Sequence, residues 1–169
     1  MRVISVFVVL LSMTAVTTAQ APAAEPIGNL ALVMRSILFP NSNILFDTQS
    51  RDPDAPAEAN EDGTVSGTFS NIYTGWGLVE AASVALAESA QLMMMPGRLC
   101  QNGKPVPIGN ADFQQYAREL VTAGTRAYEI AQTKNLEMMI EVTNDVAGAC
   151  ENCHGTYRRY PETERCTAP

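Results

Sequence analysis

Histidine is almost missing from this chain of 169 residues, which contains only His154. A single imidazole excludes a metal centre built from several histidines, a cofactor held by two histidines of one chain, and a relay of several imidazoles. Basic residues are also few, 11 against 18 acidic ones, and the net charge at pH 7 is −7. We therefore predict no nucleic-acid partner, because such binding requires a basic surface.

Long apolar runs are missing too, since none reaches the roughly 20 residues of a membrane-spanning helix. The run at residues 3–16 follows Arg2 and precedes the small residues Thr17 and Ala19. This order is typical of a secretory signal peptide, and the run is too short for the alternative, a membrane anchor. We predict a cleaved signal peptide over residues 1–19 and a periplasmic, non-spanning domain over residues 20–169. Cleavage a few residues later is also compatible with the sequence.

Proline and glycine divide the mature chain into stretches with helical periodicity. The first helix is predicted over residues 26–39, with Pro40 just past its end, and the second over residues 70–94. The third is predicted to begin after Asn110, which is a good N-cap residue. The fourth is predicted from Leu136 to about Cys153, after a short break at residues 134–135.

Between these stretches, residues 40–68 and 96–110 are predicted loops. The first loop is acidic, and we interpret it as a solvated connection rather than a cation site because it has no regular ligand spacing. No sustained alternation of apolar and polar residues predicts a strand. The pattern predicts an all-α antiparallel four-helix bundle. One face of the fourth helix is predicted to carry Leu136, Ile140, Thr143, Ala147, Cys150 and His154.

Residues 150–154 read Cys-Glu-Asn-Cys-His, which is the attachment signature of c-type heme. Helix positions three and four apart lie on one face, so Cys150 and Cys153 can both reach vinyl groups of one porphyrin and form thioether bonds. His154 then lies where its imidazole can serve as an axial ligand of the iron. We predict one covalent heme c held by Cys150 and Cys153, with His154 bound to iron.

Three other uses of these cysteines compete with heme attachment. A redox-active pair would lie at a helix N-terminus, where the dipole lowers the thiol pKa, whereas this pair lies at a helix end. A zinc site would use Cys166 as well, but the adjacent residues Cys153 and His154 do not readily point at one small ion. A structural disulfide between Cys150 and Cys153 would give a heme-free helical module.

A single Cys-x-x-Cys-His near the C-terminus of an exported helical chain resembles the class II cytochromes c, the group of cytochrome c′ and cytochrome c-556. The continuation Gly155-Thr156-Tyr157-Arg158 is similar to the family's aromatic and then basic residue after the histidine. The resemblance implies a four-helix bundle that encloses the heme and transfers single electrons. It also implies a candidate homodimer, because bundles of this family often dimerise through their first two helices.

The resemblance also makes Met34, in the first predicted helix, the candidate sixth ligand of the iron. Members with methionine there are similar to electron carriers. Cytochromes c′ leave that position open and bind NO or CO, which is the alternative function. Members often carry arginine one helical turn earlier, where this chain has Leu30. The methionines of the second and fourth helices are predicted to be packing residues: Met93, Met94, Met95, Met138 and Met139.

Three further expectations concern charge and the remaining cysteines. Arg158 is a candidate partner for a heme propionate, because a guanidinium group matches a carboxylate. Cys100 and Cys166 are expected to form a disulfide outside the cytoplasm. The acidic surface favours a redox partner with a basic patch. No nucleophile–base pair or phosphate loop accompanies the heme motif, so we predict no enzymatic activity.

Overall fold

The computed structural model describes residues 25–56, 74–159, 161 and 163–166. Within these ranges the chain is helical and has no strand, only an isolated bridge between Leu99 and Pro105. The all-α prediction is confirmed for this part of the chain. The predicted signal peptide lies outside the described residues. Among the helices that the structure describes, none is long and apolar enough to cross a membrane.

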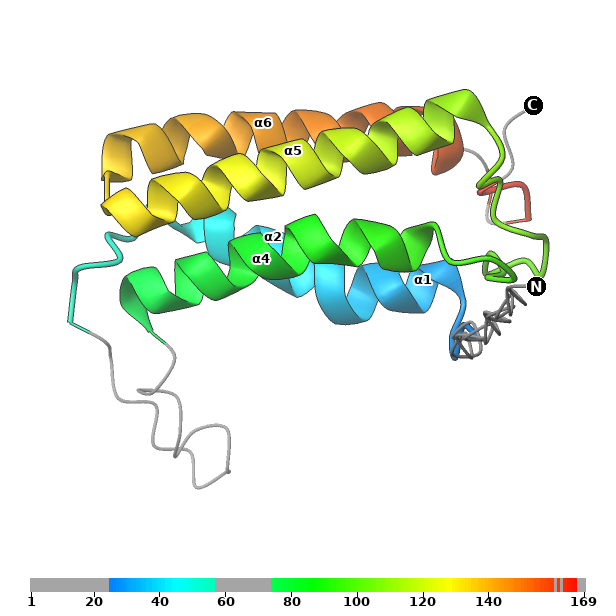
Figure 1. Ribbon diagram of the computed structural model, residues 1–169, viewed down its shortest axis with the longest axis horizontal. Helices are drawn as coiled ribbons and strands as arrows, with labels where there is room; N and C mark the ends of the chain where they lie inside the picture. The colour runs from blue at the N-terminus through cyan, green and yellow to red at the C-terminus, as the bar shows by residue number, and fades with distance from the viewer. Residues whose placement is uncertain (1–24, 57–73, 160, 162, 167–169) are drawn as a thin grey trace, which may run out of the picture.

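Four helical segments lie side by side in the described part of the chain (Figure 1). The first segment is continuous and consists of α1 (Leu30–Val33), a π-helical turn η1 (Met34–Leu38) and α2 (Phe39–Asp47). The other three are α4 (Gly75–Met93), α5 (Ala111–Thr133) and α6 (Leu136–Tyr157). Successive segments run in opposite directions (Figure 1). Residues 94–110 join α4 to α5, and only Lys134 and Asn135 join α5 to α6.

The starts of α5 and α6 agree with their sequence signals. Asn110 is the N-cap residue of α5. Lys134 adopts a left-handed conformation with φ of 54° and ends α5, as the predicted break requires. The side chain of Asn135 then caps α6 by accepting a hydrogen bond from the Met138 N–H at 3.0 Å, which satisfies one of the unpaired donors of the first turn.

The predicted end of the first helix is wrong. Helix α2 includes Pro40 and continues to Asp47, so residues 40–47 are helical rather than part of a loop. A proline normally stops a helix, because its ring clashes with the carbonyl four residues earlier and it has no N–H. Here the wider η1 turn precedes Pro40, and a π turn can accommodate such an interruption. Residues 57–68 of the predicted loop and 70–73 of the predicted second helix lie outside the described ranges.

The predicted face of α6 is also partly wrong. Ile140 is 37% exposed and Ala147 is exposed, whereas Thr143 is buried as expected. The face that enters the core includes Met139, Val142, Val146 and Ala149. Apolar residues occur on several sides of this helix, so periodicity does not define a unique face. Packing against both α5 and α2 selects the buried one.

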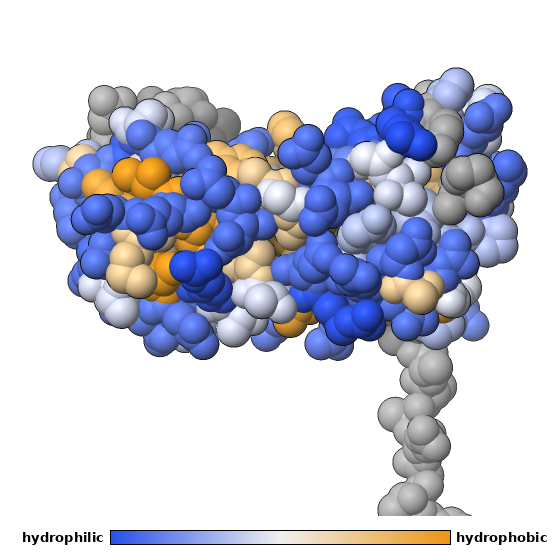
Figure 2. All heavy atoms as spheres, turned by 90° about the horizontal axis from the view of Figure 1, so that it is seen from above, coloured by the Kyte–Doolittle hydropathy of each residue, from blue (hydrophilic) through white to orange (hydrophobic). Residues whose placement is uncertain are grey.

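The face seen from the side of α5 and α6 is mostly hydrophilic, with apolar side chains gathered in a few places (Figure 2). The exposed large apolar residues of these two helices are Val121, Met138 and Ile140. Isolated apolar side chains are normal on a protein surface. The apolar residues that organise the fold therefore lie between the helices, not on this face.

Helices α4 and α5 make the most extensive contact in the described structure, and small residues allow their backbones to approach closely. Gly124 of α5 faces Ala87 of α4. A Cβ atom on Gly124 would lie 2.7 Å from the Ala87 nitrogen and 3.0 Å from its Cα atom. Both atoms belong to the backbone, so no side-chain rotation can relieve the clash. The distance between α4 and α5 thus depends on glycine at position 124.

We expect Gly124→Ala to lower the free energy of unfolding by about 1–3 kcal/mol, because the added methyl group forces the two helices apart. Gly148→Ala is the matched control, since a Cβ atom on that helical glycine has nothing within 4 Å. The control should raise stability by about 0.5–1 kcal/mol through the lower backbone entropy of alanine. Urea unfolding midpoints measure both. A Gly124→Ala protein as stable as the control would contradict the close contact.

Candidate functional site

A large pocket lies at the C-terminal end of α6, between that helix, α5 and the first helical segment. The space inside it, including the open mouth, is about 1320 Å³. The walls are mainly apolar and come from four helical segments. The apolar lining residues include Leu30, Leu38, Met93, Phe113, Leu120 and Ala149.

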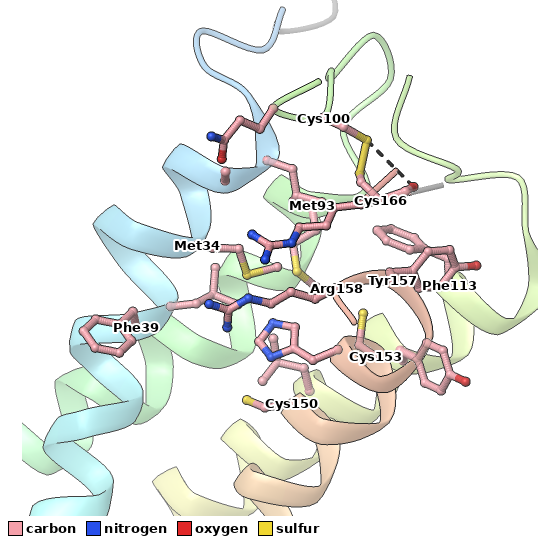
Figure 3. A pocket seen from close by; sticks show the side chains of 18 of the residues that line it. Met34, Phe39, Met93, Cys100, Phe113, Cys150, Cys153, Tyr157, Arg158 and Cys166 are labelled. Carbon is pink, nitrogen blue, oxygen red and sulfur yellow. Dashed lines mark hydrogen bonds between the residues drawn. A yellow bond between two sulfur atoms is a disulfide. The ribbon is translucent and has the colours of Figure 1, made fainter. Parts of the chain in front are cut away.

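All five residues predicted for the site line this pocket: Met34, Cys150, Cys153, His154 and Arg158. Met34 enters from the first helical segment, and Cys150 and Cys153 enter from α6 on the other side (Figure 3). The structure thus brings together residues that are far apart in the chain. Their chemical roles remain predictions.

Helix α6 delivers the motif to the pocket because it continues without a break past His154. The Arg158 N–H donates to the His154 carbonyl at 2.9 Å, which closes the last turn. The Tyr116 and Thr156 hydroxyl oxygens are 3.1 Å apart and link this turn to α5. Asn152 adds a second link by donating to Glu119 at 3.0 Å. These hydrogen bonds to α5 help to fix the orientation of the motif.

Two aromatic residues, Tyr157 and Phe113, form a wall of the pocket, and the sequence had assigned neither of them a role in the site. Tyr157 is buried, and its hydroxyl donates to the Asp112 carboxylate at 2.7 Å. Its ring meets Phe113 edge to face, with centroids 5.2 Å apart and planes at 84°. The available signal was the spacing of Tyr157 three residues after His154, which places both near one side of a helix.

Protonation of the candidate ligands follows from their burial. Burial raises the pKa of the Cys150 thiol. Burial, with smaller effects of Cys150, Asp112 and Glu119, raises the pKa of Cys153 to about 12. Burial and the nearby Arg158 cation lower the pKa of His154. At pH 7 the cysteines are thus neutral thiols, and the imidazole is neutral with a lone pair free to bind a metal.

The alternatives to heme attachment fit these observations less well. A redox-active pair needs a lowered thiol pKa, whereas the pKa values of Cys150 and Cys153 are both raised. Both residues are free thiols in the structure. The zinc alternative lacks its fourth ligand, because Cys166 is bonded to Cys100. Within the described residues, no group of three or more His, Cys, Asp or Glu side chains is placed to hold a metal ion.

The predicted disulfide between Cys100 and Cys166 is confirmed, with Cα atoms 5.9 Å apart. It closes a segment of 66 residues, which contributes about 4 kcal/mol in the chain-entropy model. Asn102 strengthens the connection by donating to the carbonyls of Thr163 at 3.0 Å and Arg165 at 2.9 Å. These contacts hold the C-terminal tail beside the pocket. Cys100 and Cys166 are both among the residues that line the pocket.

The charged residues at the pocket have the opposite sign to the chain as a whole. Arg35, Arg158 and Arg165 line it, and no aspartate or glutamate is among its lining residues. Arg35 also donates to the Gln101 side chain at 3.2 Å. The pocket therefore suits a ligand with an apolar body and carboxylate groups. Arg35 was missed at the sequence level, where nothing distinguishes it from a solvated residue.

Comparison of this chain with protein-family models, curated proteins and solved structures gave no match.

We expect the Tyr157–Asp112 hydrogen bond to make stability depend on alkaline pH. Burial and this bond raise the pKa of Tyr157 to about 12, against 10.0 for an ordinary tyrosine. The folded state holds the phenol proton more tightly, so its contribution is complete below pH 10 and is lost as the pH rises toward 12. Tyr157→Phe should lower stability by about 1–2 kcal/mol at pH 7. This deficit should shrink between pH 10 and 12.

Urea unfolding at several pH values measures the deficit. Tyr128→Phe is the control, because the Tyr128 hydroxyl only accepts an exposed hydrogen bond from Gln132. The control should show only a small deficit at pH 7. A Tyr157→Phe deficit that stays constant up to pH 12 would contradict the raised pKa.

Proposed function

We propose that this protein is a c-type cytochrome that transfers single electrons, with one covalent heme c in the pocket at the end of α6. The observation that carries the proposal is the position of Cys150, Cys153 and His154. They have the spacing of the heme attachment signature and line one large pocket. Two neutral thiols and a neutral imidazole are the groups that thioether formation and iron binding require.

The other lining residues fit a heme as well. Apolar side chains suit the body of the macrocycle, and Arg158 and Arg35 suit its propionates. When bound, heme supplies an iron centre that gains and loses one electron. The chain itself excludes water with the walls formed by Leu120, Phe113 and Tyr157, which tunes the potential of such a centre.

Met34 is the proposed sixth ligand, because it lines the pocket from the segment that faces α6. A thioether opposite an imidazole raises the reduction potential, which suits an electron carrier. Met93 is a second thioether in the same pocket. It is 4% exposed and belongs to the core, so we retain the interpretation of Met93 as a packing residue.

The wider proposal follows the resemblance to the class II cytochromes c. The helical segments are proposed to form an antiparallel four-helix bundle, exported to the periplasm by residues 1–19. A protein redox partner is part of the proposal, as is a homodimer. The net charge of −7 favours a partner with a basic patch, although the arginines near the pocket give that region the opposite sign.

Heme attachment is tested by expressing the full chain in a host that attaches heme c. We expect the mature protein to carry the mass of one heme and to give the pyridine hemochrome spectrum of a c-type cytochrome. After unfolding and reduction, only Cys100 and Cys166 should react in a brief treatment with iodoacetamide at mildly alkaline pH, because thiolates are alkylated much faster than thioether sulfurs. The double variant Cys150→Ser/Cys153→Ser should lose the heme.

The matched control is Cys100→Ser/Cys166→Ser, which removes the disulfide and should keep the heme. Four reactive thiols in the reduced wild-type chain, together with no hemochrome, would overturn the proposal in favour of a heme-free helical module.

The role of Met34 is tested by the ferric absorption spectrum. We expect a low-spin spectrum with a thioether-to-iron charge-transfer band in the wild type. Met34→Ala should abolish that band, lower the reduction potential and allow CO to bind after reduction. Met93→Leu, a change at the second thioether of the pocket, is the control and should keep the band. A wild type that is already high-spin and binds CO would instead indicate a gas-binding protein similar to cytochrome c′.

A further inference from the structure

The first helical segment contains a π-helical turn that begins at Met34 and ends at Leu38. The Phe39 N–H donates to the Met34 carbonyl, five residues earlier, instead of the carbonyl four residues earlier as in an α-helix. Such turns insert one residue into an α-helix and often occur at functional sites. This turn starts at the residue proposed to face the heme iron.

The buried positions of the segment show the effect of the inserted residue. On either side of η1 they follow ordinary helical spacing, with Leu30 and Val33 before it and Ser42 and Leu45 after it. Between Val33 and Leu38 the spacing is five residues. One residue of an α-helix corresponds to a rotation of about 100°. Without the π turn, the two halves could not both bury their apolar faces against α4.

Pro40 lies directly after the turn. In an unbroken α-helix its ring would clash with the Ser36 carbonyl, and it has no N–H to donate to that carbonyl. The side-chain amide of Asn41 donates to the Ile37 carbonyl at 2.7 Å, so one carbonyl of the turn has a side-chain donor. Proline at position 40 thus disfavours closure of the segment into a plain α-helix.

We propose that Pro40 is a positioning residue: it keeps the η1 turn open and thereby directs Met34 into the pocket while Leu38 and Leu45 remain in the core. The ligand role of Met34 rests on the proposed function, whereas the direction of its side chain does not. In the plain α-helical register, α1 would turn by about 100° relative to α2. Helix α1 has 4 residues and α2 has 9, so α1, with Met34, is the part that turns.

The test is Pro40→Ala in the heme-loaded full chain, with two readouts. The first is alkylation of methionines by iodoacetamide, located by peptide mass spectrometry. Met138 is 43% exposed and Met139 is fully buried, so these neighbours serve as internal references for fast and slow reaction. We expect Met34 to react slowly in the wild type and to approach the rate of Met138 in Pro40→Ala. The second readout is the thioether-to-iron band, which should weaken in parallel.

A rescue variant separates register from a general loss of stability. Removing the exposed Ser36 from the Pro40→Ala chain deletes the inserted residue, so a plain α-helix keeps both halves in phase. Slow alkylation of Met34 and the charge-transfer band should then return. Pro96→Ala, at a proline just past α4, is the control and should change neither readout. Fast alkylation of Met34 in the rescue variant, with Met139 still protected, would overturn the register explanation.

Failure of this inference differs from failure of the proposed function. If the wild type lacks heme or the thioether band, heme binding or ligation by Met34 is wrong. Met34, which is half-buried, should then still be alkylated more slowly in the wild type than in Pro40→Ala if its direction depends on Pro40. If Pro40→Ala leaves Met34 as protected as in the wild type, the role of Pro40 is wrong even when the heme spectrum is as expected.

Discussion

Burial of one face of α6 controls where its candidate heme-binding groups lie. Met139, Val142 and Val146 are fully buried against α5 and the first helical segment. The helix is continuous to Tyr157, and a continuous α-helix has a fixed rotation per residue. Cys150, Cys153 and His154 therefore reach the pocket as a consequence of packing one to three turns earlier in the helix. The motif provides the reactive side chains. Burial of the apolar residues of α6 determines the direction in which those side chains point.

The opposite side of the pocket depends on different interactions. There, Met34 belongs to a segment whose phase changes at a π turn. The disulfide between Cys100 and Cys166 places the C-terminal tail and the loop after α4 at the edge of the pocket. Neither part lies on a regular, uniformly amphipathic helix. Position on this side is maintained by one covalent bond, one helix irregularity and a few side-chain hydrogen bonds.

Prediction from the sequence succeeded where a local interaction decides the structure. Asn110 and Asn135 mark helix starts because N-cap preferences involve only the next few residues. It failed at Pro40, where the local rule predicts a helix end but burial of Leu45 and its neighbours extends the helix. It failed in part on α6, where Ile140 was expected in the core and lies outside it. In both cases tertiary packing overrides the local preference.

The sequence by itself determined which groups α6 presents together, since Cys150, Cys153 and His154 lie within two helical turns and their relative positions follow from helix geometry. Only the tertiary structure decided what meets them. Met34 and Arg35 line the same pocket although more than 100 residues separate them from the motif, and the tail cysteine Cys166 lines it as well. Contacts between distant residues depend on the burial of many apolar side chains along all the helices. No short stretch of the sequence determines that total burial.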